Sequence, residues 1–146
     1  MKTEGQKNSR MLRVLIVDDH PAVRQGLGVL LEPEGIIVCA EADGRAEALA
    51  ACRQHRPDVV LVDLSLGDED GATLLADLRD LGLLPVVYSM HEDGGHVKGA
   101  FAAGALGYVT KREVHRVLVQ AIVEVAAGRR FVSPRAALGM ADQAVD

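Results

Sequence analysis

The sequence predicts an α/β fold in which a five-stranded parallel sheet is doubly wound, with helices on both of its faces. Three observations support this prediction. Short apolar runs rich in β-branched residues recur along the chain, which is typical of strands that are buried on both faces. These runs begin roughly 20 to 30 residues apart, which leaves room for one crossover helix between successive strands. The segments between the runs have helical periodicity, so strands and helices alternate.

The predicted strands are short, and the last of them is the weakest. They cover residues 14–17, 36–40, 59–62, 85–88 and 107–109. Five parallel strands in a doubly wound fold most often take the flavodoxin-like order 2-1-3-4-5. We therefore expect a (βα)5 unit in which the first and third strands are neighbours.

The predicted helices follow these strands in turn. Pro21 suits the first turn of the first helix, and Gly128 is expected to end the fifth. The fourth helix has the thinnest apolar stripe. The apolar positions of the five helices, in chain order, are Val23, Leu27, Leu30 and Leu31; Ala46, Leu49 and Ala50; Leu74, Leu75 and Leu78; Val97 and Phe101; and Val114, Val117, Leu118, Ala121, Ile122 and Val125.

The length of the chain, 146 residues, is enough for one domain with its own hydrophobic core. We expect that domain at residues 12–130. Residues 1–11 are predicted to form an N-terminal tail. Residues 131–146 are predicted to be a C-terminal tail, or the start of a linker to an output domain that is missing here.

The composition narrows the class of function. The chain has 16 Lys and Arg against 21 Asp and Glu, and this net charge of −5 disfavours nucleic acid and acidic membranes as partners. No apolar run is long enough to span a membrane, and the first ten residues lack the apolar centre of a signal peptide. Cys39 and Cys52 form no disulfide framework or metal-binding pattern. We therefore expect a cytoplasmic protein.

Carboxylates follow two strands that the predicted order makes neighbours. Asp18 and Asp19 come directly after the first strand, and Asp63 comes directly after the third. The carboxyl ends of parallel strands meet at one edge of the sheet, so these groups should converge. Three close carboxylates repel one another unless a cation lies among them, and oxygen ligands favour Mg²⁺, with Mn²⁺ as an alternative. The plainer reading is that Asp18 and Asp19 cap the following helix.

A hydroxyl and an ammonium group follow the last two strands. Ser89 comes directly after the fourth, and Lys111 follows the fifth. Lys111 precedes a helix, whose N-terminal dipole disfavours a cation, so its position is easier to explain if an anion lies opposite it. Carboxylates, a hard cation, a hydroxyl and a lysine together suit a transferred phosphoryl group, with one carboxylate as the nucleophile.

Residues from about 12 to 128 resemble the receiver domain of two-component response regulators. The motifs that carry this resemblance are Asp18-Asp19, Asp63 followed by Gly71, Ser89, and Gly107-Tyr108-Val109-Thr110-Lys111. Segments 89–93 and 130–134 resemble those of one branch of this family, whose members usually carry a C-terminal helix-turn-helix domain of the LuxR/NarL type. That domain is absent here. One departure is Gly67, where the family usually has proline, and it predicts a looser loop.

The resemblance implies a phosphoacceptor and a metal site. Asp63 would accept a phosphoryl group as an aspartyl phosphate. Mg²⁺ would be held by Asp19, Asp63 and the backbone carbonyl of Ser65, and Asp18 would act mainly through a water.

The resemblance also implies a switch and its partners. Ser89 and Lys111 would bind the phosphoryl oxygens, and Tyr108 would be the aromatic side chain that changes rotamer. The phosphodonor would be a sensor histidine kinase or a histidine phosphotransfer protein. Phosphorylation would regulate an output, transcription in this branch, and could be accompanied by homodimer formation. The chain would be a signalling protein rather than a turnover enzyme, although it would assist its own phosphorylation and dephosphorylation.

Other functions fit the same fold less well. A small Mg²⁺-dependent phosphatase with an aspartyl nucleophile would need an acidic residue two positions after Asp63, where Ser65 stands. A flavin carrier would need a phosphate-cradling loop and aromatic residues, which make up only 3% of the chain. The five histidines show no spacing that is typical of a metal site. His91 is expected either in an exposed loop or above the phosphorylation site.

Overall fold

The computed structural model describes residues 11–64 and 71–145, and within these ranges six parallel strands form one sheet in the order β2-β1-β3-β4-β5-β6. The strands are β1 (Leu12–Val17), β2 (Ile36–Ala42), β3 (Val59–Val62), β4 (Pro85–Ser89), β5 (Gly107–Thr110) and β6 (Phe131–Val132). The predicted doubly wound α/β class is confirmed, as is the order of its five strands. Each predicted strand lies within an observed one.

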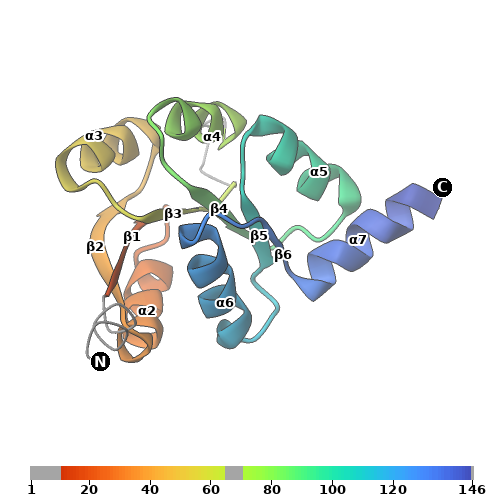
Figure 1. Cartoon of the computed structure of the whole chain (residues 1–146), viewed down its shortest axis with the longest axis horizontal. Coiled ribbons are helices and arrows are strands. Elements are labelled where there is room, and N and C mark those ends of the chain that lie inside the picture. The colour runs from red at the N-terminus through yellow and green to blue at the C-terminus, as the bar shows by residue number, and fades with distance from the viewer. Residues whose placement is uncertain (1–10, 65–70, 146) are drawn as a thin grey trace, which may run out of the picture.

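Helices cover both faces of the sheet (Figure 1). On one face lie α3 (Arg45–His55), α4 (Gly71–Asp80) and α5 (Gly94–Ala103), and on the other lie α2 (Pro21–Leu31) and α6 (His115–Ala126). A short 3-10 helix, η1 (Glu32–Glu34), follows α2. It ends at Gly35, whose φ of 80° lies in the left-handed region that favours glycine. The five crossover helices thus appear in the predicted places.

Alternate strand residues face the two layers of the core. Leu15 and Val17 pack in the cluster that includes Ala48 and Leu74, beneath α3, α4 and α5. Val14 and Ile16 point the other way and pack with residues of α2 and α6. Residues 14–17 of β1 and 59–62 of β3 are continuous apolar runs because helices bury them on both sides. All strands are parallel, so their carboxyl ends lie at the same edge of the sheet.

The chain after residue 130 adds elements that the five-stranded prediction did not include. Phe131 and Val132 of β6 pair with Gly107 and Tyr108 of β5 at the edge of the sheet. α7 (Pro134–Val145) follows and packs against α5, extending past the sheet (Figure 1). The prediction of five strands is therefore one strand short. A strand of two residues shows no readable periodicity and exists only because β5 offers it an edge.

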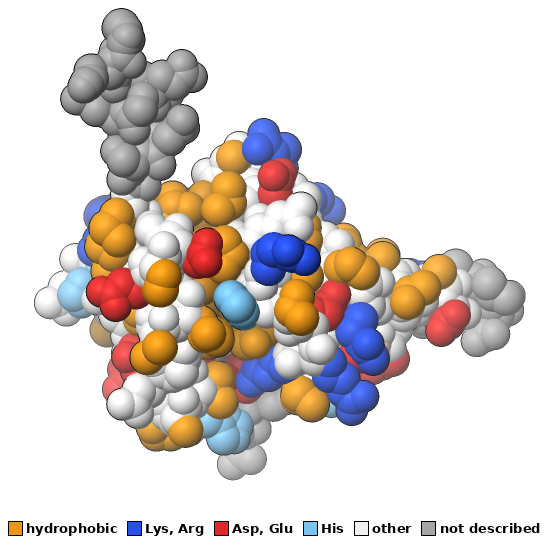
Figure 2. Space-filling view, turned by 90° about the horizontal axis from the view of Figure 1, so that it is seen from below, with side chains coloured by type: hydrophobic (Ala, Val, Ile, Leu, Met, Phe, Trp, Pro, Cys, Tyr) orange, Lys and Arg blue, Asp and Glu red, His pale blue; other side chains and the backbone are white. Residues whose placement is uncertain are grey.

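The surface over α2 and α6 is chemically mixed. Figure 2 shows acidic, basic and apolar side chains interspersed on this face. Val29 on α2 and Val114 just before α6 are among the exposed apolar side chains. Over the described ranges, no helix has the length and apolar character needed to cross a bilayer.

Candidate functional site

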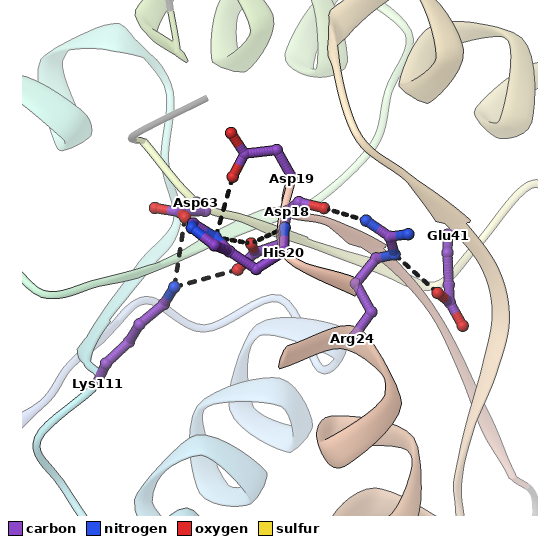
Figure 3. A network of polar contacts seen from close by, with 7 residues as sticks. All are labelled: Asp18, Asp19, His20, Arg24, Glu41, Asp63 and Lys111. Carbon is purple, nitrogen blue, oxygen red and sulfur yellow. Dashed lines mark hydrogen bonds and ion pairs between the residues drawn. The ribbon is translucent and has the colours of Figure 1, made fainter. Parts of the chain in front are cut away.

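Carboxylates and a lysine meet at the carboxyl edge of the sheet (Figure 3). Asp18 follows β1 and Asp63 follows β3, and the two residues are 2% and 5% exposed. Nζ of Lys111, which follows β5, lies 3.1 Å from Oδ2 of Asp18 and 3.3 Å from Oδ2 of Asp63. The Asp19 side chain lies further out and is 34% exposed. Together with His20, the three carboxylates offer ligand atoms that all lie within 4.8 Å of one another.

Backbone hydrogen bonds hold these residues in place. The N–H of Asp63 donates to the carbonyl of Val17, and the N–H of Asp18 donates to the carbonyl of Ala42, each over 3.0 Å. Each aspartate therefore continues the pairing of its strand by one residue. The N–H of Lys111 donates to the carbonyl of Ser89 over 2.8 Å in the same way. The side chains thus start from positions that the sheet itself determines.

Lys111 compensates the charge of the buried carboxylates. Burial is the largest influence on the pKa of Lys111 and lowers it, but the hydrogen bond to Asp18 and the charge of Asp63 leave that pKa above its ordinary value. For Asp18 burial is again the largest influence, and it raises the pKa of this carboxyl. Hydrogen bonds from His20 and Lys111 nevertheless bring that pKa below its ordinary value. Lys111 and Asp18 are therefore both ionised near neutral pH.

His20 also belongs to this site, although it is not among the site residues predicted from the sequence. Its Nδ1 lies 2.8 Å from Oδ1 of Asp18 and 2.9 Å from Oδ1 of Asp19. The hydrogen bond to Asp18, followed by the charges of Asp19 and Asp18, raises the pKa of His20 above its ordinary value. The imidazole therefore lies against carboxylate oxygens that a cation would contact. The position of His20 directly after Asp18-Asp19 is the feature of the sequence that could have predicted its place in the site.

The capping alternative does not account for Asp18 and Asp19. The N-cap residue of α2 is His20, and no side chain makes a capping hydrogen bond there. Oδ1 of Asp18 instead accepts a hydrogen bond from the N–H of His20 over 2.9 Å. Arg24 on α2 stabilises the segment between β1 and α2, because its guanidinium donates to the backbone carbonyl of Asp18 and to Glu41 on β2 (Figure 3).

Ser89 and Tyr108 are linked to the segment between β4 and α5. Both residues are fully buried. Oγ of Ser89 accepts a 3.1 Å hydrogen bond from the N–H of His91, and the hydroxyl of Tyr108 donates a 2.8 Å hydrogen bond to the carbonyl of His91. The side chains of Ser89 and Tyr108 are therefore both hydrogen-bonded to the backbone of His91. Burial raises the pKa of Tyr108, so its hydroxyl remains a neutral donor.

Gly71 lets α4 begin close to the end of β3. A Cβ at this position would lie 3.0 Å from Cδ2 of Leu64 and 3.3 Å from the Cα of Leu64. Glycine therefore permits a close approach that a larger residue would disturb. The predicted metal-binding carbonyl of Ser65 and the predicted loose loop at Gly67 lie outside the described residues.

A doubly wound sheet with an acidic cluster at the carboxyl ends of β1 and β3 defines a class of α/β proteins whose ligands bind at that edge. The family model described as the response regulator receiver domain matches residues 14–123. The chain therefore belongs to the response regulator receiver family, and it is a receiver domain of two-component signalling. The resemblance seen in the sequence is confirmed, and the phosphatase alternative is not favoured.

Relatives of known name support this assignment. Response regulator GacA of Pseudomonas aeruginosa is 38% identical over 136 residues, which cover 90% of this chain and 63% of the relative. The probable transcriptional regulatory protein NarL of Mycobacterium tuberculosis is 34% identical over 135 residues, which cover 90% and 62%. The chain thus spans about three fifths of the length of these curated relatives.

Solved structures agree with the fold. The crystal structure of a LuxR-family two-component response regulator from Aurantimonas sp. SI85-9A1 matches with a TM-score of 0.88 at 38% identity, covering 93% of this chain and 99% of that one. The signal receiver domain of the putative response regulator NarL from Mycobacterium tuberculosis matches with a TM-score of 0.76 at 33% identity, covering 82% and 99%.

Proposed function

We propose that Asp63 accepts a phosphoryl group from a sensor histidine kinase or a histidine phosphotransfer protein. The observation that carries this proposal is the ammonium of Lys111, which lies between the buried carboxylates of Asp18 and Asp63. A cation in this position can neutralise the oxygens of an incoming phosphoryl group. Asp18 contacts the same ammonium, and we assign the nucleophile to Asp63 because the receiver family has its phosphoacceptor aspartate at this position, directly after the third strand.

The chemistry of the proposed step is a phosphoryl transfer between two side chains. A carboxylate oxygen of Asp63 attacks the phosphorus of a phosphohistidine on the donor. The O–P bond forms as the P–N bond breaks, and the leaving imidazole nitrogen takes up a proton from solvent. Lys111 would then exchange its contact with the Asp63 carboxylate for one with a phosphoryl oxygen. Later hydrolysis of the aspartyl phosphate would restore the starting state.

The acidic cluster suits Mg²⁺, or Mn²⁺ in its place. Carboxylate oxygens are the ligands that these hard cations prefer, and here they lie close enough together to share one ion. Asp19, Asp63 and the carbonyl of Ser65 would hold the ion, with Asp18 acting mainly through a water. When bound, the ion supplies positive charge that offsets the phosphoryl oxygens. His20 would release its two carboxylate contacts to make room.

Ser89 and Tyr108 are the proposed switch residues. Ser89 would leave the N–H of His91 to bind a phosphoryl oxygen, and Tyr108 would move into the space that Ser89 leaves. Both side chains are buried and both contact the backbone of His91. A change at either of them therefore reaches the start of α5. This connection supports the segment from β4 to α5 as the moving part.

The whole protein is proposed to regulate transcription. The named relatives support this proposal, since they are regulators that are longer than this chain. Residues 12–130 would be the receiver unit, 1–11 a tail, and 131–146 a C-terminal tail or the start of a linker to an output domain. Phosphorylation would promote homodimer formation, and DNA would be contacted by the output domain and not by this chain. The proposed location is the cytoplasm.

Intact-mass measurement with a small phosphodonor such as acetyl phosphate tests the assignment of Asp63. The protein should gain the mass of one phosphoryl group when Mg²⁺ is present, and the gain should disappear in chelator. Asp63→Asn should abolish it. Asp80→Asn, at the exposed end of α4, is the matched control and should label normally. Full labelling of Asp63→Asn would show that the phosphoacceptor lies elsewhere.

A further inference from the structure

A second cluster of metal-ligating side chains lies between β4 and the first turn of α5. It consists of His91, Asp93 and His96, each of which offers one ligand atom, and these atoms all lie within 4.8 Å of one another. The rings of His91 and His96 are stacked, with centroids 3.9 Å apart and planes inclined by 2°. Two imidazoles and one carboxylate make this set richer in nitrogen donors than the cluster beside Lys111, which has three carboxylates and one imidazole. Such a set suits a borderline cation more than Mg²⁺.

We propose that His91, Asp93 and His96 form a site for a divalent transition metal, with Zn²⁺ as the representative ion. Nδ1 of His96 lies 2.7 Å from Oδ1 of Asp93 and 2.9 Å from Oδ2. In a tetrahedral site with ligand bonds of about 2.0–2.2 Å, neighbouring ligands lie about 3.3–3.6 Å apart, so these two atoms would separate by roughly half an ångström when the ion enters. The ion would replace the proton that these two atoms share. One imidazole nitrogen of His91 would be the third ligand, and water would complete the coordination.

The fold holds two of the three ligands in place. Asp93 is the N-cap residue of α5, and its Oδ2 accepts a 3.1 Å hydrogen bond from the N–H of His96. The hydrogen bonds from His96 also keep the pKa of Asp93 below its ordinary value, so the carboxylate is charged. Glu92, the other acidic residue here, is engaged with Arg135 at 2.8 Å instead. Among the described residues, the ligand set is therefore His91, Asp93 and His96.

The third ligand requires a local adjustment. The lone pair of an imidazole nitrogen lies in the plane of its ring, and two parallel rings cannot both direct lone pairs at one ion. The stack of His91 and His96 would therefore open when the metal binds. The His96 side chain is 47% exposed, so it has room to rotate. Asp93 also borders an open groove of about 700 Å³ beside α7, which gives the ion a path from solvent.

The position of His91 connects this site to the proposed switch, and this part of the inference rests on the proposed function. The N–H of His91 donates to Ser89, and its carbonyl accepts from Tyr108. A metal that ties His91 to the first turn of α5 would keep both contacts in their present form. Rearrangement of Ser89 on phosphorylation would then be opposed. Coupling between two sites is reciprocal, so phosphorylation would also weaken metal binding.

Calorimetric titration of the tag-free chain with Zn²⁺, in millimolar Mg²⁺ to occupy the acidic cluster, tests the site. The wild type should bind one equivalent. The double variant His91→Ala/His96→Ala should bind at least about tenfold more weakly, as expected when metal-site residues are removed. The matched control is His55→Ala/His115→Ala, which removes two histidines outside the cluster and should bind like the wild type. Equal affinity of the two double variants would overturn the site.

Two further measurements separate the site from its coupling. In NMR spectra, Zn²⁺ should shift the ring signals of His91 and His96 and leave those of His55 and His115 in place; the reverse pattern would overturn the assignment. Zn²⁺ should also slow labelling of Asp63 by the phosphodonor in the wild type but not in His91→Ala/His96→Ala. Tight binding with unchanged labelling would refute the coupling. The affinity measurement involves no phosphorylation, so its result does not depend on Asp63.

Discussion

Nζ of Lys111 lies 3.3 Å from Oδ2 of Asp63, although 48 residues separate the two in the chain. The same ammonium also contacts Asp18, so one positive charge compensates two buried carboxylates. This arrangement keeps the acidic edge of the sheet stable when no metal ion is present. It also predicts what happens when the cation is removed.

Lys111→Ala should destabilise the metal-free protein. The substitution removes the ammonium from two buried carboxylates, and a hydrogen bond to a charged group contributes about 1.5–3 kcal/mol. The free energy of unfolding, measured with urea in chelator at pH 7, should fall by that amount. Saturating Mg²⁺ should recover most of the loss, because the ion replaces the missing charge. Lys98→Ala, on the exposed side of α5, is the control and should change little.

Asp19→Ala and His20→Ala should change Mg²⁺ affinity in opposite directions. Asp19 is a proposed direct ligand, so its loss should weaken binding by at least about tenfold. His20 contacts Oδ1 of both Asp18 and Asp19, so its removal should free these oxygens and tighten binding a few-fold. Titration of each variant with Mg²⁺ at pH 7 measures both effects. Weaker binding by His20→Ala would mean that the imidazole supports the ion and does not compete with it.

The thiol of Cys52 should react slowly in the folded protein. Burial raises the pKa of Cys52 to about 11 from an ordinary value of 9.0. The thiolate is the reactive form, so near pH 8 alkylation should be on the order of 100-fold slower than in the unfolded chain. The rate should rise about tenfold per pH unit towards pH 11, because each unit multiplies the thiolate fraction by that factor.

A Cys39→Ser variant, which leaves Cys52 as the single thiol, makes this measurement specific. Alkylation with iodoacetamide can be followed by intact mass across the pH range in which the protein stays folded. A rate that levels off near pH 9 would show that the fold does not shield Cys52.

Gly139→Ala should weaken the docking of α7. A Cβ at Gly139 would collide with the backbone carbonyl oxygen of Glu92, and a backbone atom cannot move aside cheaply. We expect a loss of about 1–3 kcal/mol in the free energy of unfolding, typical of overpacking. Gly99→Ala is the matched control, since its Cβ would meet nothing within 4 Å. That change inside α5 should instead stabilise by roughly 0.5–1 kcal/mol. Urea denaturation measures the free energy of unfolding of both variants and shows whether it falls for Gly139→Ala and rises for Gly99→Ala.

The sheet and the place of its acidic groups could be predicted because they depend on local patterns. An apolar run such as 59–62 identifies a strand buried on both faces, and the polar residue that follows it, Asp63, must then lie at the carboxyl edge. The order of the strands was predicted because 2-1-3-4-5 is the most frequent order of five parallel strands in a doubly wound sheet. Asp18, Asp19, Asp63 and Lys111 could therefore be assigned to one edge without coordinates.

Other features depend on contacts that no local pattern contains. β6 has two residues and exists because β5 offers it an edge, and α7 docks because Gly139 lets its backbone approach Glu92. His91 and His96 are five residues apart across a loop and the start of a helix, which matches no regular period. They meet because Asp93 begins α5 between them and orients His96.

The sequence by itself therefore determined the α/β fold, its strand order and the carboxylates that the strands deliver to one edge, because burial on two faces and parallel pairing leave few alternatives. Only the tertiary structure decided how those groups are compensated and connected. It placed Lys111 between Asp18 and Asp63, and it tied Ser89 and Tyr108 to the backbone of His91. Side-chain contacts of this kind depend on distances of a few ångströms between separate elements, and periodicity along the chain does not encode them.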